Sequence, residues 1–210
     1  MAAQFDHVAI SQMSWQARLH NHKQVFFLPH AKATQLNHAH LMATCLVTGT
    51  DSPKPDVSGL TSDQVGPLKK FADTRNIATT TNTDAAATSV KAIDTSTGTE
   101  QNWRDKLHAS RDAKIAADEA ATRKAYADAE AHINTLPEAI QGKAANVFEA
   151  AMTWVAAAYK AVAEALTEAF NKIIDGINKA IKAVVDAANT AVHWVEGAAS
   201  SVEHFFGNLF

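Results

Sequence analysis

Apolar side chains recur at every third or fourth position from about Asn146 to Phe206, and polar side chains keep the same spacing between them. Steps that average close to 3.6 residues are typical of an amphipathic helix, which would be on the order of 90 Å long if it were continuous. Gly176 and Gly197 interrupt the pattern, so we expect a break or bend near one of them and a helical hairpin. The apolar positions are Phe148, Met152, Val155, Tyr159, Val162, Leu166, Phe170, Ile173, Ile177, Ile181, Val184, Ala188, Val192, Val195, Ala199, Val202 and Phe206.

An apolar stripe of this length must be covered, because left in water it would cause aggregation. The sequence allows three covers, which are the chain's own helices, another protein chain, or a lipid surface. The polar face carries four lysines and seven acidic residues between Phe148 and Phe206. Helices that bind membrane surfaces are usually rich in Lys and Arg, so this balance favours helix–helix packing, or a pore-forming helix that folds first and inserts later. The candidate partner- or membrane-binding residues are Phe148, Met152, Val155, Tyr159, Leu166, Phe170, Ile173, Ile177, Ile181, Val184, Trp194, Phe205 and Phe206.

A second helical pattern, poorer in apolar residues, follows Thr99. Thr97 or Thr99 can cap its start, and Glu100 lies in the first turn, where the helix dipole favours an acid. The rest is dense in residues compatible with a helix. Its sparse apolar residues predict a narrow seam on a charged rod, as in a coiled coil or a helix packed on one side. The seam residues are Trp103, Leu107, Ile115, Tyr126 and Ile133.

We expect a mainly α fold, with a small mixed N-terminal part followed by a long amphipathic helical hairpin or bundle. Residues 1–72 form the His-rich mixed α/β part, with two or three short strands, or a strand and a short helix, and another short helix near 61–73. Residues 73–98 are rich in threonine and poor in charge, which predicts a connector; an edge hairpin covered by the helices is the alternative. Residues 99–210 form the helical region, in which Pro137 can open a helix and Gly142 can break one.

Six of the ten histidines lie in the first forty residues, and two pairs have the spacing His-x-His. On a strand this spacing places both rings on one face, so two neighbouring strands could offer four imidazoles to Zn²⁺, Ni²⁺ or Cu²⁺. Cys45 is close enough in sequence to join them. A divalent metal is therefore the one cofactor that we consider, and ordinary surface and core histidines in a small sheet are the alternative. The candidate ligands are His20, His22, His38 and His40.

Composition and charge narrow the function classes. The chain of 210 residues is 47% apolar with a formal net charge of −3, which is globular and disfavours a dedicated nucleic-acid binder. A single cysteine excludes an internal disulfide and fits a reducing compartment, or export without disulfide formation. The first residues lack the basic and apolar regions of a Sec signal peptide, and no uncharged apolar run reaches the ~20 residues of a membrane span. We expect synthesis in the cytoplasm and, where export occurs, a route without a Sec signal peptide.

Catalytic motifs are missing from the sequence. It contains no G-x-S-x-G, P-loop, G-x-G-x-x-G or C-x-x-C pattern, and Cys45 lacks a His–Asn context. We therefore expect a protein that is not an enzyme, has no catalytic or cofactor-binding residues, and acts through a protein partner, self-association or membrane contact.

The last fifth of the chain, "FNKIIDGINKAIKAVVDAANTAVHWVEGAASSVEHFFGNLF", resembles helical stretches of bacterial secreted polymorphic toxins and type VI effectors. It is also similar to repetitive stretches of phage tail tape-measure proteins. The resemblance implies a bacterial or phage delivery system and carries no catalytic residue with it. We therefore expect a non-catalytic helical interaction or delivery module of a secreted toxin or effector. The alternatives are a structural component of a phage-tail-like or injection machine, and a metal-binding N-terminal domain on a helical stalk.

Overall fold

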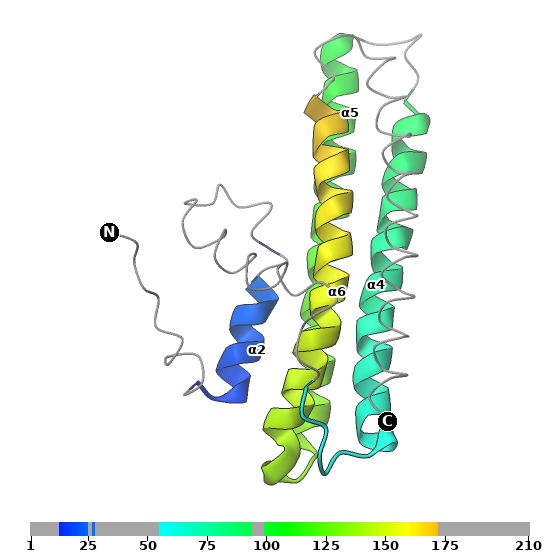
Figure 1. Cartoon of the computed structure of the whole chain (residues 1–210). Coiled ribbons are helices and arrows are strands. Elements are labelled where there is room, and N and C mark those ends of the chain that lie inside the picture. Colours follow the sequence, from blue (N-terminus) through cyan, green and yellow to red (C-terminus); the bar gives the residue numbers. More distant parts are fainter. Residues whose placement is uncertain (1–12, 25–26, 28–54, 94–98, 172–210) are drawn as a thin grey trace, which may run out of the picture.

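The computed structural model describes residues 13–24, 27, 55–93 and 99–171, and within them the side chains other than those of Glu100 and residues 157–171. This part of the chain contains four helices, which are α2 (Trp15–Gln24), α4 (Ser62–Lys91), α5 (Glu100–Asn134) and α6 (Glu138–Asn171). Every regular element in it is helical, which confirms the mainly α fold class. Figure 1 shows α4, α5 and α6 side by side as a long rod, with the short α2 against one side of it.

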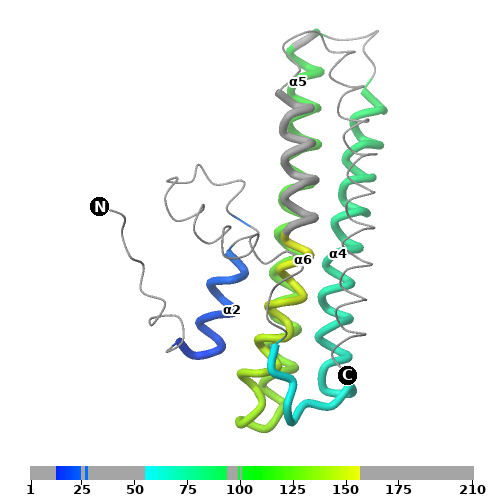
Figure 2. Tube along the Cα trace, in the orientation of Figure 1, coloured from blue at the N-terminus to red at the C-terminus, as the bar shows by residue number. Residues whose placement is uncertain are grey.

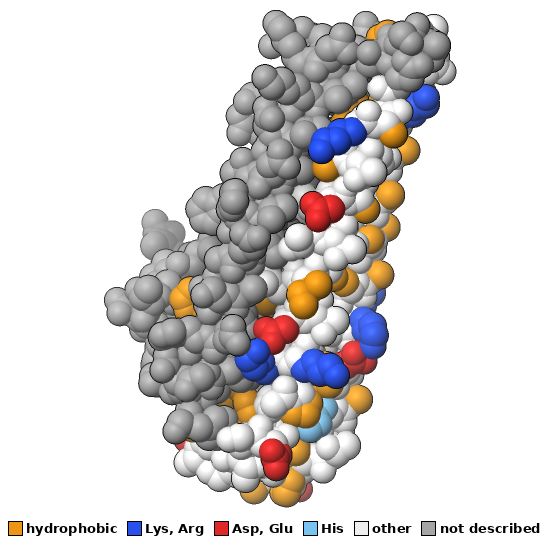
Figure 3. Space-filling view, turned by 90° about the vertical axis from the view of Figure 1, so that its right-hand side faces the viewer, with side chains coloured by type: hydrophobic (Ala, Val, Ile, Leu, Met, Phe, Trp, Pro, Cys, Tyr) orange, Lys and Arg blue, Asp and Glu red, His pale blue; other side chains and the backbone are white. Residues whose placement is uncertain are grey.

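The three long helices alternate in direction. The chain ascends in α4, descends in α5 and ascends again in α6 (Figure 2). Short connections between consecutive helices favour such antiparallel neighbours. The half of the rod where α4 and α6 begin is called the proximal half below, and the half near the connection from α4 to α5 is called the distal half. One long side of the rod carries Lys and Arg interspersed with Asp and Glu, which keeps that side free of a single-sign field (Figure 3).

The start of α5 confirms the cap that the sequence predicts. Thr99 is the N-cap residue, and its hydroxyl accepts a hydrogen bond from the backbone N–H of Asn102 at 3.3 Å. The Asn102 side-chain oxygen accepts a hydrogen bond from the backbone N–H of Thr99 at 3.0 Å, which completes a capping box. Helix α6 begins at Glu138, directly after Pro137, as predicted. Gly142 does not break it, since α6 continues through this residue to Asn171.

The connector predicted for residues 73–98 is wrong over residues 73–91, and so is the alternative edge hairpin. Helix α4 occupies Ser62–Lys91, so the boundary expected between residues 72 and 73 falls inside a helix of 30 residues. Two of its threonines satisfy their hydroxyls locally, because Thr83 donates to the Thr79 carbonyl at 2.7 Å and Thr79 donates to the Arg75 carbonyl. Both are buried against the bundle. Tertiary burial therefore overrides the weak helix propensity of threonine.

An apolar core fills the proximal half of the rod. Tyr126 packs edge-on against Phe148, with ring centroids 5.2 Å apart and an interplanar angle of 81°. The core draws on all four helices, so the short α2 belongs to the same unit as the long ones. Its members include Leu19 of α2, Leu68 and Ala72 of α4, Tyr126 and Ile133 of α5, and Phe148, Met152 and Val155 of α6.

The predicted partner- or membrane-binding residues divide into three groups. Phe148, Met152 and Val155 are buried in the core, so in this conformation the chain's own helices cover the first part of the apolar stripe. Tyr159, Leu166 and Phe170 lie on α6, where the side chains are outside the described part. The remaining candidates lie outside the described residues altogether, as do the expected bends at Gly176 and Gly197; these candidates are Ile173, Ile177, Ile181, Val184, Trp194, Phe205 and Phe206.

The seam predicted on α5 is only partly apolar. Leu107, Tyr126 and Ile133 are buried, whereas Trp103 and Ile115 are half-buried. The buried positions between Leu107 and Tyr126 are Ser110, Lys114, Asp118, Thr122 and Ala125, of which only the last is apolar. The middle of the seam is therefore polar and partly charged.

We predict that Phe148→Ala lowers the free energy of unfolding by about 3–5 kcal/mol, because it removes a buried ring and leaves a cavity beside Tyr126. The matched control is Ile77→Ala on α4, where the side chain is 62% exposed. The control should change stability by less than about 0.5 kcal/mol. Urea unfolding followed by circular dichroism measures both, and equal effects at the two sites would contradict this description of the core.

Candidate functional site

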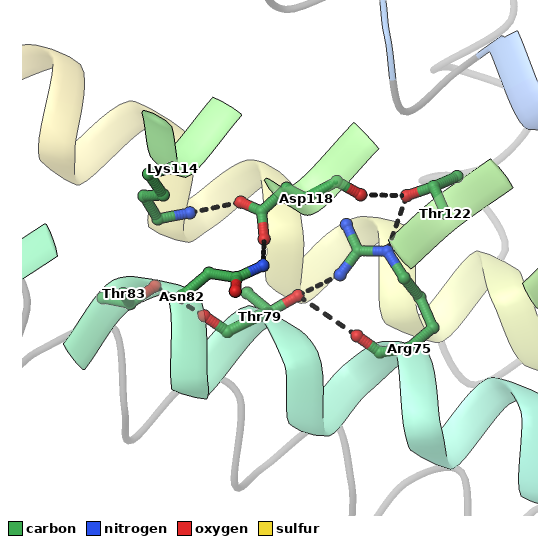
Figure 4. Close-up of polar contacts among 7 residues, drawn as sticks. All are labelled: Arg75, Thr79, Asn82, Thr83, Lys114, Asp118 and Thr122. Carbon is green, nitrogen blue, oxygen red and sulfur yellow. Dashed lines mark hydrogen bonds and ion pairs between the residues drawn. The ribbon is translucent and has the colours of Figure 1, made fainter. Parts of the chain in front are cut away.

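A layer of buried polar side chains lies between α4 and α5, next to the apolar core. Figure 4 shows its seven members, which we call the polar layer: Arg75, Thr79, Asn82 and Thr83 of α4, and Lys114, Asp118 and Thr122 of α5. The α5 members are four residues apart, and on α4 Asn82 and Thr83 follow Thr79 by three and four residues, so the members on each helix project from one face toward the other helix. All are buried except Asn82, which is half-buried.

Arg75 crosses from α4 to α5. Its Nε donates to the Thr122 hydroxyl at 2.6 Å, and a terminal guanidinium nitrogen donates to the Thr79 hydroxyl. The Thr122 hydroxyl in turn donates to the Asp118 carbonyl at 2.9 Å. Each threonine therefore accepts a bond from the cation while it donates to a backbone carbonyl of its own helix, and this arrangement orients both hydroxyl groups.

Asp118 is the acidic centre of the layer. One carboxylate oxygen accepts from the Asn82 amide nitrogen of α4 at 2.8 Å, and the other pairs with the Lys114 ammonium one turn earlier on α5. Burial lowers the pKa of Lys114, the Asp118 carboxylate opposes this change, and Arg75 adds to it. Asp118 therefore favours the charged form of Lys114 and also links this side chain to α4 through Asn82.

The polar layer specifies how α4 and α5 align. Taking ions out of water is costly, and their attraction repays this cost only when partners are well placed. A slip of one turn between the helices would break both the Arg75–Thr122 and the Asn82–Asp118 hydrogen bonds, and a buried charge that loses its partners costs several kcal/mol. Beyond the layer, Ser110 donates to the Ala86 carbonyl at 3.2 Å, which continues the polar linkage of the same two helices.

A second polar cluster holds α2 against α5 and α6. The Trp15 indole donates to the Gln141 side chain at 3.2 Å. Arg18 donates to the Asn146 side chain at 2.6 Å and to the Gly142 carbonyl at 3.4 Å. We call the contacts of α2 with α5 and α6 the α2 interface. Apart from Leu19, which is buried, the α2 side of this interface is largely polar.

Two titratable groups in the α2 interface have shifted pKa values. His22 lies between Tyr126 and Thr153, where one ring nitrogen meets the Tyr126 hydroxyl and the other lies 3.3 Å from the Thr153 hydroxyl. Burial lowers the pKa of His22 to about 4. Burial also raises the pKa of Glu149 to about 7, against the opposing effect of the Arg18 guanidinium, whose Nε lies 3.7 Å from a carboxylate oxygen. Both groups are therefore held in their neutral forms near pH 6.

The structure separates the first pair of predicted metal ligands. His20 and His22 lie on helix α2, not on a strand, so about 200° of helical rotation separates them. His20 is exposed, whereas His22 points into the α2 interface. His38, His40 and Cys45 lie outside the described residues. Within the described part of the chain, no group of three or more His, Cys, Asp or Glu side chains is placed to hold a metal ion.

The sequence analysis missed the polar layer, although a signal for it was present. Ser110, Lys114, Asp118 and Thr122 recur at the spacing of the apolar seam that starts at Leu107. Polar residues in phase with an apolar seam mark buried polar positions when a helix packs closely. On α4 the corresponding residues lie in a threonine-rich stretch, whose composition predicts a connector and hides the helical spacing.

Comparison with known proteins yields no relative. No protein-family model matches the chain, and neither the curated proteins nor the solved structures contain a match. Among the described helices, none is long and apolar enough to cross a membrane.

We predict that Asp118→Ala lowers the free energy of unfolding by about 3–5 kcal/mol, because it leaves the Lys114 ammonium buried without its carboxylate. The matched control is Asp128→Ala, which removes an acid paired with Lys124 at the same spacing on the exposed face of the same helix. The control should cost at most about 0.5 kcal/mol. Urea unfolding of both variants measures the difference, and a small effect of Asp118→Ala would show that the layer is not a buried ionic unit.

We predict opposite pH dependences for two variants of the α2 interface. A histidine pKa lowered from 6.5 to about 4 decreases stability as the pH falls through that window, whereas a glutamate pKa raised from 4.5 to about 7 decreases stability as the pH rises through its own window. Relative to the wild type, Glu149→Gln should therefore gain stability as the pH rises from 4.5 to 7. His22→Gln should gain stability as the pH falls from 6.5 to 4.

The slope should reach at most about 1.4 kcal/mol per pH unit, and less where solvent screens the group. Unfolding free energies measured from pH 4 to pH 7.5 test both signs. Parallel curves for the wild type and both variants would contradict the assignment of these two groups.

Proposed function

We propose that this chain is a non-catalytic helical interaction or delivery module of a bacterial secreted toxin or effector. In this proposal, the amphipathic C-terminal sequence packs on a partner protein or enters a membrane after the bundle has opened. The observation that carries the proposal is the charged polar layer buried between α4 and α5, next to the apolar core of the helical bundle.

The polar layer favours separation of α4 and α5, because water can solvate its charged side chains once the helices move apart. Buried ion pairs are weak contributors to stability, and well-packed apolar replacements are often neutral or stabilising by about 1–4 kcal/mol. Water can rehydrate Arg75, Lys114 and Asp118 when α4 and α5 separate, which lowers the cost of separation there. The apolar core around Phe148 has no such compensation. We infer that separation of the long helices from one another begins at the polar layer, while the proximal core stays packed.

The sequence beyond α6 continues the apolar pattern, which could bind a partner or a membrane once the bundle has opened. The apolar spacing that includes the buried Phe148, Met152 and Val155 continues in the sequence to Phe206. Between Phe148 and Phe206 the polar positions carry four lysines and seven acidic residues. This balance favours packing on other helices over binding to an anionic membrane surface. A protein partner, including a second copy of the chain, is therefore the first expectation, and membrane entry is the second. The resemblance of this stretch to helices of bacterial delivery proteins is consistent with both.

The test compares the wild type with a variant whose polar layer has been made apolar, Arg75→Met with Lys114→Met and Asp118→Leu. The variant should be at least as stable as the wild type, because the ions no longer have to be desolvated. It should also open less readily, so it should self-associate less and release less dye from liposomes. Light scattering during size-exclusion chromatography and liposome dye release are the two measurements.

The outcomes separate the functional classes. Self-association or dye release by the wild type that decreases in the apolar-layer variant supports the proposal. A monomer at every concentration, together with intact vesicles at every pH tested, would contradict it. A large oligomer of defined size, formed equally by both proteins, would instead favour a structural assembly component.

A further inference from the structure

The short helix α2 depends on the rest of the protein for its structure. It has 10 residues, and isolated helices shorter than about 12–15 residues are marginal in water. Ser14 helps to start it, since its carbonyl accepts from the Arg18 N–H at 3.1 Å and its hydroxyl accepts from the Ala17 N–H at 3.3 Å. The basic residues His22 and Lys23 in its last turn suit the helix dipole, but its first turn contains no acidic residue, so local interactions support only one end of this short helix. Folding of α2 is therefore coupled to its docking.

The α2 interface is also weaker than the contacts among the long helices. Leu19 is its one fully buried apolar side chain, and Trp15 is only partly buried where it packs against the core. The other anchors are the polar contacts of Arg18 and His22, together with the hydrogen bond of the Trp15 indole. Water can replace polar contacts at small net cost, since a hydrogen bond contributes only about 0.5–1.5 kcal/mol, or about 1.5–3 kcal/mol when one partner is charged. In Figure 1, α2 contacts the rod along one side only.

The fit of α2 against α5 is incomplete. A hollow of about 300 Å³ lies beside α2, and its walls include Leu19 and Tyr126 together with the polar side chains of His20, Lys23 and Glu130. Imperfect packing forfeits dispersion contacts along this edge. The three features together make α2 the part of the described bundle that costs least to release.

We propose that α2 is a detachable latch, which docks and undocks as a unit while α4, α5 and α6 stay folded. Release uncovers the groove of α5 and α6 that α2 occupies, formed by Tyr126, Gln141, Asn146, Glu149 and Thr153. Tyr126 links this groove to the apolar core, because its ring packs edge-on against Phe148 and its hydroxyl contacts His22. Undocking therefore gives water access to one edge of the apolar core. The latch does not depend on the function proposed above.

Hydrogen exchange of the full-length protein, followed by mass spectrometry, tests the latch. Amides of α2 should exchange at least about a hundredfold faster than those around Leu68, Ile133 and Val147, when each rate is corrected for its intrinsic value. Arg18→Ala removes two hydrogen bonds and a cation while it keeps a strong helix former in place. It should speed exchange in α2 by about 10- to 100-fold and leave α4, α5 and α6 within about twofold.

Two further variants distinguish release from simple loss of the helix. Gln16→Ala is the matched control, since Gln16 is an exposed residue of the same helix, and exchange should stay unchanged. Asn146→Ala removes the main acceptor of Arg18 from the α6 side, so it should also speed exchange in α2. Its effect should not add to that of Arg18→Ala, because both remove the same contact.

The results that would overturn the latch are specific. Exchange of α2 at the rate of the long helices would show that it opens only when the whole bundle unfolds. An effect of Arg18→Ala of equal size in α4, α5 and α6 would show the same. Fully additive effects of the Arg18 and Asn146 variants would show that their contact does not hold the helix. None of these measurements involves a membrane or a partner, so their outcome is separate from that of the vesicle and association experiments.

Discussion

The described structure depends on one constraint, which is that buried charges must meet their partners across the contact between α4 and α5. Arg75 reaches Thr122, and Asn82 reaches Asp118, so both helices contribute to each linkage. A buried charge without its partner is far more costly than a mispacked apolar side chain, so this layer favours the register in which both linkages form. The apolar core then packs α6 against the aligned pair, and α2 docks on the surface that α5 and α6 form.

Tyr126 contributes to both the apolar core and the α2 interface. Its ring packs on Phe148 in the apolar core, and its hydroxyl meets His22 in the α2 interface. The same residue therefore stabilises the long helices through apolar contact and the short helix through a polar one. The contacts between helices therefore differ in the free energy needed to separate them. The proximal core is apolar, the polar layer is ionic, and the α2 interface is polar and incompletely packed. Such differences locate the parts of a protein that open at low cost.

Much of the helical architecture was predictable from the sequence, whereas most of the candidate site was not. The Thr99 cap and the start of α6 after Pro137 depend on neighbours within one helical turn, so local sequence was enough. The first part of α4 matches the short helix predicted near 61–73, but its continuation to Lys91 was not predicted, because threonine has weak helix propensity and only burial compensates for it. The polar layer was missed because Arg75 and Thr122 are 47 residues apart, and no local pattern links them. The histidine pair was assigned strand geometry, and its position on α2 separates the two rings.

The sequence by itself determined that long amphipathic helices make up the second half of the described chain, because the spacing of apolar residues is a local property that repeats at every turn. It also determined where α5 and α6 begin, since capping groups lie beside the groups that they cap. The tertiary structure alone decided which polar residues are buried and which faces they join. The reason is physical: the free energy of a buried ion depends on a partner brought from another helix, and that partner is specified by folding and not by proximity along the chain.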